Sequence, residues 1–195
     1  MNYLAHAYLS FNEPEILVGN MISDFVKGKK QFGFPGGIRQ GIIVHRSIDT
    51  FTDDHKATKE AKQFLKPAVG LYAGAFVDVV YDHFLACDKN EFTNESLLQF
   101  SLSVYTTLDK YATVFPEKFA HMFSYMKHDN WLYNYRTLNG AEKSLQGLVR
   151  RAKYLHNSEI VFEYFEKNYK ELQSCYNDFF PDVKNFALGQ IRSIQ

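Results

Sequence analysis

The sequence predicts an all-α protein, a single-domain bundle of seven to nine helices. Apolar residues recur at the three- and four-residue steps of a helix along most of the chain, and no segment alternates convincingly as a strand would. With 195 residues, the chain can bury a substantial core without disulfides or metals. We therefore expect residues 1–195 to form one helical domain.

The N-terminal part of the chain predicts short helices separated by clear breaks. An apolar stripe over 4–11 comes first. Asn12 and Glu15 form a capping-box pattern that predicts the start of the next helix, and Gly28 is expected to end it. A basic Gly-Pro loop over 29–37 then leads into the third helix.

The third helix carries the polar stretch VHRSIDTFTDDH, in which Asp54 and His55 are interpreted as the helix end. Pro67 is expected to break the chain again. Residues 71–86 contain valines that favour a strand, but their apolar stripe favours a helix. Residues 95–114 also show a helical pattern.

The remaining helices are predicted from their start and stop signals. Pro116 is placed as the first-turn proline of one helix, and Asn139 with Glu142 forms a second capping-box pattern. Residues 158–180 are expected to form the last long helix, which Pro181 ends. The many Phe and Tyr residues of the chain indicate a core rich in aromatic rings.

Composition argues against several classes of partner. The 22 basic and 22 acidic side chains balance, so no overall field favours nucleic acid or an anionic membrane. There is no run of about 18 apolar residues and no signal-peptide pattern, so we expect no membrane association. Cys87 and Cys175 lie too far apart for a zinc motif, and a reduced, cytoplasmic protein is the simpler interpretation.

Polar residues four positions apart interrupt the apolar stripes of four helices in residues 1–90. Residues at this spacing share one face of a helix. A carboxylate that faces a core needs a partner or a cation, and imidazole with carboxylate suits Mn²⁺, Fe²⁺, Zn²⁺ or Mg²⁺. Facing helices of a bundle can build such a metal site. The pairs are Asn2–His6, Asn20–Asp24, His45–Asp49 with Asp53 one turn on, and Asp78–Asp82, which His83 follows.

Each pair, taken alone, also has a structural explanation. His6 could be a hydrogen-bonded core histidine, and Asn20 and Asp24 could satisfy loop backbone. His45 and Asp49 could be an ordinary surface pair. Together, however, the pairs favour a metal or catalytic site.

Basic residues beside these pairs indicate phosphate chemistry. Arg46 offers bidentate hydrogen bonds, and Lys27, Lys29 and Lys30 offer point charges just after Asp24. A metal with carboxylate and histidine ligands beside such cations suits phosphoester hydrolysis. Lys29 and Lys30 could equally belong to a solvated loop.

Segments of the chain resemble the acyl carrier protein phosphodiesterase family in order and spacing. The resemblance implies a fold related to the HD-domain metal phosphohydrolases. It implies release of 4'-phosphopantetheine from a serine of acyl carrier protein, in fatty acid biosynthesis, with Mn²⁺ as the typical metal and Mg²⁺, Fe²⁺ or Co²⁺ as alternatives. The segments are MNYLAHAYLS, GNMISDFVKG, HRSIDTFTD and DVVYDHFL, followed by WLYNYR.

The resemblance and the pairs together suggest a role for each residue. Unlike generic HD enzymes, which carry an adjacent His-Asp pair, this chain has Asp82 before His83, so ligands are not copied from those enzymes. The expected metal ligands are His6, Asp24, His45, Asp49, Asp78 and Asp82. The expected catalytic residues are Asp24, Arg46, Lys27 and His83, the last for proton transfer. The expected substrate-binding residues are Asn20, Lys27, Lys29, Lys30 and Arg46, and Asn2 and Asp53 are expected to support the ligands.

An acidic carrier protein would need a local basic docking patch. Its candidates are the loop 27–30, Lys56, Lys59 and Lys62. The aromatic second half would complete the bundle and line a groove for the pantetheine arm. Two alternatives stay open, a metal hydrolase of another phosphoester such as a nucleotide and a non-catalytic helical protein that binds carrier protein.

Overall fold

The all-α prediction is confirmed. The computed structural model describes residues 1–155 and 157–194, and within these ranges every regular element is a helix. Four short 3₁₀ turns, at Ser23–Phe25, Gly28–Gly33, Gly70–Tyr72 and Ala112–Val114, connect some of the α-helices. The α-helices are α1 (Tyr3–Tyr8), α2 (Pro14–Ile22), α3 (Gly36–Asp54), α4 (Lys56–Val69), α5 (Ala73–Cys87), α6 (Asn94–Lys110), α7 (Glu117–His128), α8 (Trp131–Asn134), α9 (Leu138–Arg151), α10 (Ser158–Lys167) and α11 (Tyr169–Arg192).

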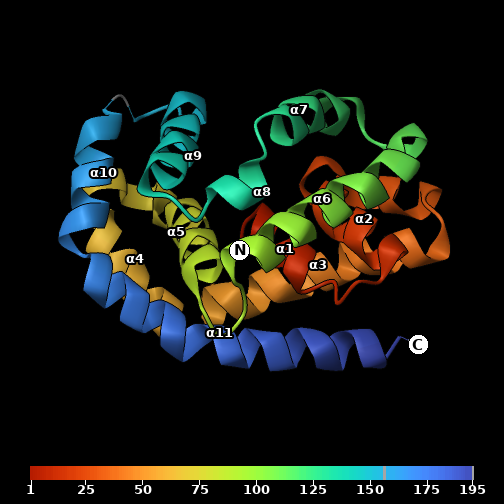
Figure 1. The fold of residues 1–195 in the computed structure, drawn as a ribbon, viewed down its shortest axis with the longest axis horizontal. Coiled ribbons are helices and arrows are strands. Elements are labelled where there is room, and N and C mark those ends of the chain that lie inside the picture. The colour runs from red at the N-terminus through yellow and green to blue at the C-terminus, as the bar shows by residue number, and fades with distance from the viewer. Residues whose placement is uncertain (156, 195) are drawn as a thin grey trace.

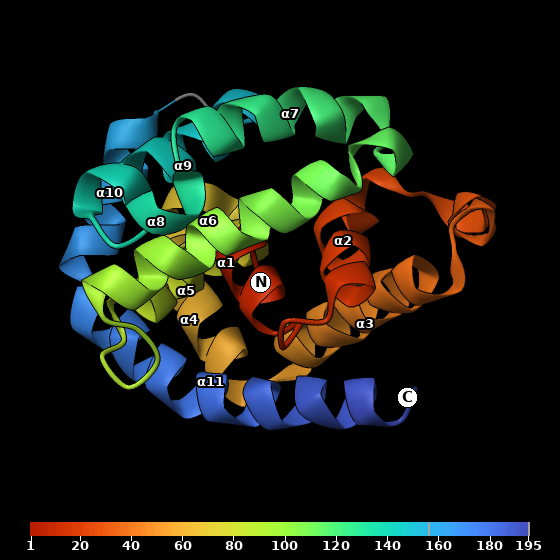
Figure 2. The ribbon, with the colours of Figure 1, turned by 45° about the vertical axis from the view of Figure 1, so that its right-hand side comes forward.

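The short helix α1 lies in the middle of the bundle, where it contacts α2 on one side and α5 on the other (Figures 1 and 2). The long helix α11 runs along one edge and packs on α3, α4 and α5 (Figure 1). Helix α7 lies at the opposite edge in both views. This arrangement surrounds the first residues of the chain with later helices.

Helices α2 and α3 cross at two glycines. A Cβ atom on Gly19 would lie 2.1 Å from the carbonyl oxygen of Ile38, and one on Gly41 would lie 2.4 Å from that of Ile16. Only glycine allows the two backbones to approach this closely. The crossing therefore sets the positions of nearby polar residues on the two helices, and Asn20 is one of them.

The predicted bounds of the second helix are wrong at both ends. Asn12 has a left-handed backbone (φ 63°) and does not cap the helix, which begins at Pro14. Proline is favoured there because the first N–H of a helix has no partner within it. The α-helix ends at Ile22 rather than Gly28, and the 3₁₀ turn that follows carries Asp24.

Two prolines that were expected to end helices lie inside them. Pro67 belongs to the last turn of α4, where its missing N–H removes one hydrogen bond of the helix. Pro181 lies within α11, whose buried stripe continues on both sides of it. The predicted helix over 158–180 is instead divided at Asn168, whose side chain donates to the carbonyl oxygen of Tyr164 at the end of α10 (2.7 Å).

One predicted helix junction is confirmed and one predicted cap is wrong. His55 closes α3 and also caps α4, since its Nδ1 accepts from the backbone N–H of Ala57 (3.3 Å). Helix α9 is capped by Thr137 and not by Asn139, because the Thr137 hydroxyl accepts from the N–H of Gly140 (3.0 Å).

Residues Lys56–Cys87 pass a length and composition test for a membrane span. In the structure they form two helices, α4 and α5, joined by a 3₁₀ turn. Helix α4 packs on α10 and α11, and α5 packs on α1 and α9. Their apolar character is accounted for by this packing.

Replacing Gly41 with Ala is expected to destabilise the protein by roughly 2 kcal/mol or more, because the new methyl group would meet the α2 backbone. Gly36→Ala, at the start of the same helix with open space around it, is the matched control and should change the free energy of unfolding by less than about 0.5 kcal/mol. Urea denaturation of both variants measures the difference. Equal stability would contradict the close crossing.

Candidate metal centre and active site

Two histidines from different helices meet at one carboxylate. Asp49 Oδ1 lies 3.1 Å from Nε2 of His6 on α1, and Asp49 Oδ2 lies 3.0 Å from Nε2 of His45 on α3. The two imidazole rings stack with their centroids 3.9 Å apart. Each of the three side chains offers one ligand atom within 4.8 Å of the others, which is a spacing that a single metal ion can bridge. We call these three residues the His-Asp cluster.

Asp24 extends the His-Asp cluster toward solvent. Its Oδ1 lies 3.3 Å from Nε2 of His45. Its side chain is 66% exposed, whereas that of His45 is 6% exposed. A substrate would therefore approach the cluster from the side of Asp24.

Asn20 determines which nitrogen of His6 carries a proton. Asn20 Nδ2 donates to the His6 carbonyl oxygen (3.1 Å) and to the Ser10 hydroxyl (3.0 Å). Its Oδ1 therefore faces His6 Nδ1 at 3.0 Å, and because an amide oxygen only accepts, Nδ1 must donate. Neutral His6 then presents an unprotonated Nε2 to an oxygen of Asp49.

The pKa values of the two histidines are shifted in opposite directions. Burial and the neighbouring charge of His45 lower the pKa of His6 to about 4. Burial also works against charge on His45, but hydrogen bonds with Asp24 and Asp49 outweigh it and raise the pKa of His45 to about 9. The pKa of Asp49 is lowered, because its hydrogen bond with His45 and the nearby positive charges outweigh its burial. That of Asp24 is lowered chiefly by its hydrogen bond with His45.

These contacts fit a cation. At neutral pH His6 is uncharged, so the lone pair of its Nε2 and that of an Asp49 oxygen face each other at 3.1 Å. Two lone pairs at this distance repel unless a proton or a metal ion lies between them. Two imidazoles with carboxylates form a donor set suited to Mn²⁺, Fe²⁺ or Zn²⁺. Asn20 supplies the outer hydrogen bond that orients a histidine ligand.

Asp82 holds a helix end instead of joining the cluster. It is fully buried, and its oxygens accept from the backbone N–H groups of Leu4 (2.7 Å) and Ala5 (3.1 Å) at the start of α1. Burial raises its pKa to about 7, against the opposing effect of these two hydrogen bonds. The prediction of Asp82 as a ligand does not match this position, because both of its oxygens serve the α1 backbone.

Asp78 is linked to the cluster through the amino group of Met1. Its Oδ1 lies 2.8 Å from the amino nitrogen of Met1, which also lies 3.6 Å from Asp49 Oδ1. Burial raises the pKa of Asp78, and the Met1 amino group opposes that shift. The structure therefore places Asp78 behind Asp49 rather than beside the imidazoles.

His83 is bound elsewhere. Its Nδ1 lies 2.7 Å from the carbonyl oxygen of Tyr135, and its Nε2 lies 2.9 Å from the hydroxyl of Tyr169. Burial lowers its pKa. Because both ring nitrogens have partners in the second half of the chain, its position does not match the predicted role in proton transfer.

The two expected supporting residues also contact other parts of the molecule. Asn2 donates to the hydroxyl of Tyr135 (3.0 Å), and Asp53 accepts from Lys62 (2.6 Å) at the surface. Ser10, which the sequence analysis missed, does support the site through its hydrogen bond with Asn20. Its signal was present, since Ser10 is four residues from His6 and donates to the His6 carbonyl oxygen (2.8 Å).

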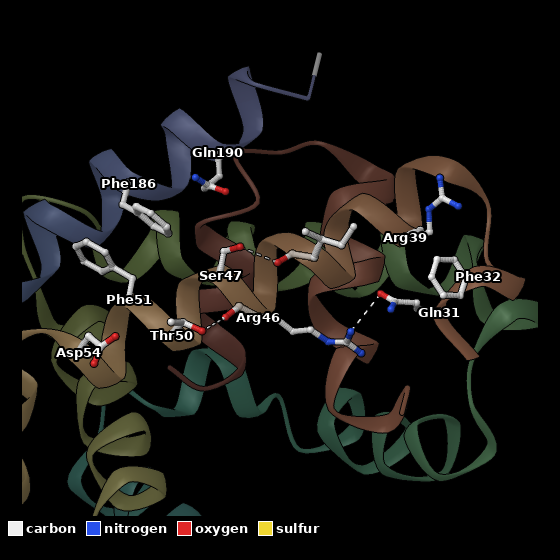
Figure 3. A pocket seen from close by; sticks show the side chains of 11 residues that line it. Gln31, Phe32, Arg39, Arg46, Ser47, Thr50, Phe51, Asp54, Phe186 and Gln190 are labelled. Carbon is white, nitrogen blue, oxygen red and sulfur yellow. Dashed lines mark hydrogen bonds between the residues drawn. The ribbon is translucent and has the colours of Figure 1, made fainter. Parts of the chain in front are cut away.

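Arg46 is hydrogen-bonded to the loop that carries Lys27, Lys29 and Lys30. Its guanidinium donates to the Val26 carbonyl oxygen (2.8 Å). It also donates to Gln31 Oε1 (3.1 Å) (Figure 3). The Arg46 side chain also lines a cavity of about 1060 Å³ between α3 and α11, together with Phe32 and Phe186 (Figure 3). Its bonds to the loop make Arg46 a positioning residue in this arrangement.

The lysines divide between two environments. Lys27 and Lys30 line a second cavity, of about 750 Å³, which also includes Asp24. Lys29 is exposed on the same loop. Of the other docking candidates, Lys62 pairs with Asp53 and Lys59 with Asp54, so two of them are largely neutralised, while Lys56 is exposed.

Comparison with known proteins shows to which family the chain belongs. The family model for acyl carrier protein phosphodiesterase matches residues 1–183. The chain belongs to the acyl carrier protein phosphodiesterase family. Proteins named acyl carrier protein phosphodiesterase are similar over most of their length: one from Yersinia pestis is 30% identical over 96% of this chain and 97% of its own, and one from Enterobacter sp. (strain 638) is 29% identical over 93% and 94%. No solved structure matches the chain, so the relation of this phosphodiesterase family member to the HD-domain fold stays a prediction.

The free energy of unfolding of the metal-free phosphodiesterase should fall as pH rises from about 6.5 to about 9. The folded state raises the pKa of His45, so the stabilisation is complete below the unfolded value near 6.5 and is lost as pH passes the folded value. The loss should be roughly 2–3 kcal/mol. Urea denaturation with a chelator at several pH values measures it, and the same slope in His45→Gln would contradict the assignment.

Asp82→Ala should destabilise the metal-free protein by roughly 2–4 kcal/mol, because it leaves two buried N–H groups of α1 without acceptors. Asp82→Asn keeps one acceptor oxygen and should cost less. Asp178→Ala, at an exposed position of α11, is the control and should be close to neutral. If Asp82→Ala is as stable as the control but fails to bind metal, Asp82 is a ligand after all.

Proposed function

We propose that this protein is a metal-dependent phosphodiesterase that hydrolyses holo acyl carrier protein to apo carrier protein and free 4'-phosphopantetheine. The family match over residues 1–183 and the names of the relatives support the substrate. The proposed metal dependence rests on the two imidazoles that contact the Asp49 carboxylate, because those contacts favour a bound cation.

His6, His45 and Asp49 would hold the metal, with Asp24 as a further ligand on the open side. We propose Mn²⁺, with Fe²⁺, Co²⁺ and Mg²⁺ as alternatives, since histidine ligands favour a transition metal over Mg²⁺. When bound, the ion would activate water and polarise the phosphoryl oxygen. Asn20 would keep His6 Nε2 free for coordination by accepting the proton of Nδ1 in a hydrogen bond.

The remaining steps fall to residues at the open side. Asp24, whose carboxylate is exposed at the open side and lies beside His45, would accept a proton from the attacking water. The oxygen of that water bonds to phosphorus, the bond from phosphorus to the serine oxygen breaks, and the serine oxygen takes up the proton that Asp24 accepted. Lys27 would offset the charge of the phosphate, and Arg46 would hold the Lys27 loop in place.

Carrier protein is the proposed partner, and the cytoplasm the proposed compartment. Cys87 and Cys175 are unpaired, which suits a reducing environment. The docking patch is revised, because Lys59 and Lys62 already pair with acidic neighbours. Lys27, Lys29 and Lys30 remain candidates, all on the loop next to Asp24.

Incubation of the purified protein with Mn²⁺ and holo carrier protein should remove the phosphopantetheine mass from the carrier, as read by mass spectrometry. Asp49→Asn and His45→Gln should each lower the rate by about a hundredfold or more, because a ligand is lost. Asp53→Asn, one turn further along α3 and paired with Lys62 at the surface, is the matched control and should remain active.

Other outcomes would favour the alternatives. Hydrolysis of bis(p-nitrophenyl) phosphate without action on holo carrier protein would indicate a phosphohydrolase with another substrate. Inactivity on both, with no Mn²⁺ retained after dialysis, would overturn the proposed enzyme and favour a helical protein that only binds its partner.

A further inference from the structure

A groove leads away from the candidate metal centre between the loop 24–34 and residues 114–118. We propose that this groove holds the 4'-phosphopantetheine arm of the substrate, with the phosphate end at Asp24. The inference rests on the proposed function, since it takes the substrate from there. It adds the place in the chain where that substrate is recognised.

Asp24 connects the groove to the chemistry. It lines the groove, and its Oδ1 lies 3.3 Å from Nε2 of His45 in the His-Asp cluster. A phosphate at this end would therefore lie beside the proposed ligands. The larger cavity between α3 and α11 is lined by Arg46 but by none of the four proposed ligands.

The walls of the groove provide an apolar surface of the kind that a flexible chain with methyl groups and amides can cover. Phe25, Phe34 and Phe115 line it. Phe25 and Phe115 each make an edge-to-face contact with the fully buried ring of Phe119, at centroid distances of 5.5 and 4.8 Å. Anchored aromatic rings form a surface that is in place before the ligand arrives.

The charges of the groove complement a phosphate. Lys27 and Lys30 come from one wall and Lys118 from the other, where Glu117 is the neighbouring acid. Among residues 1–155 and 157–194, none of these three lysines forms an ion pair. Three free cations near one open carboxylate suit an anionic group at that end.

The volume of the groove is also suitable. It measures about 750 Å³, within the range of roughly 300–1,000 Å³ that small-molecule sites occupy. The two walls come from segments about 90 positions apart in sequence, which explains why the aromatic second half of the chain contributes to a site whose proposed ligands lie in the first 50 residues.

The test measures binding of free 4'-phosphopantetheine by calorimetry, with Mn²⁺ present, and compares it with pantetheine, which lacks the phosphate. The double variant Lys30→Glu, Lys118→Glu should weaken binding of 4'-phosphopantetheine at least fivefold and change binding of pantetheine little. Phe34→Ala should weaken both ligands at least threefold. The controls are Lys66→Glu, at an exposed position of α4, and Phe162→Ala, at a half-buried position of α10. Circular dichroism confirms that each variant folds.

The outcomes separate the groove from the reaction. Suppose that the wild-type protein cleaves holo carrier protein, and that the groove variants bind 4'-phosphopantetheine as well as the wild type does. The proposed binding groove is then wrong, and the proposed function is unaffected. If the wild-type protein binds 4'-phosphopantetheine through these residues but does not cleave holo carrier protein, the groove stands and the proposed reaction fails. Absence of binding in an active wild-type protein also overturns the groove.

Discussion

The carboxylate of Asp49 joins two helices that would otherwise have little reason to meet at this point. It contacts His6 of α1 and His45 of α3. A helix as short as α1, with six residues, is not stable by itself and depends on such contacts. Asp82 holds its N-terminal end, and Asn20 and Ser10 hold the turn that carries His6. The contacts that form the proposed metal centre are therefore also contacts that fix α1 in the bundle.

The crossing of α2 and α3 positions two side chains of the candidate site. Gly19 and Gly41 bring the two backbones together, which keeps Asn20 within reach of His6. Where α2 gives way to a 3₁₀ turn, Asp24 is directed toward His45 and remains open to solvent. The irregular end of α2 is therefore part of what builds the site.

Sequence periodicity was sufficient to predict the helical class and to select the residues of the His-Asp cluster as candidates. A spacing of four residues places side chains on one helix face, whichever other helix that face contacts. It could not separate Asp49 from Asp82, since both are carboxylates within apolar helices and only the tertiary structure gives Asp82 the N–H groups of α1. Nor could it foresee the hydrogen-bond partners of His83, since Tyr135 and Tyr169 lie far along the chain. Pro181 misled because burial of the stripe along α11 outweighs one lost hydrogen bond.

The charges of the cluster link metal binding to phosphate binding. Without metal, Asp24 and Asp49 are ionised and His45 is protonated, so these groups together carry a net negative charge that repels a phosphodiester. If Asp24, His45 and Asp49 held a divalent cation, His45 would be neutral and the two positive charges would balance the two carboxylates. The repulsion at the mouth of the groove would then be removed, and the lysines around it would act on the phosphate without opposition from the cluster. The metal would thus govern where the substrate binds as well as how it reacts.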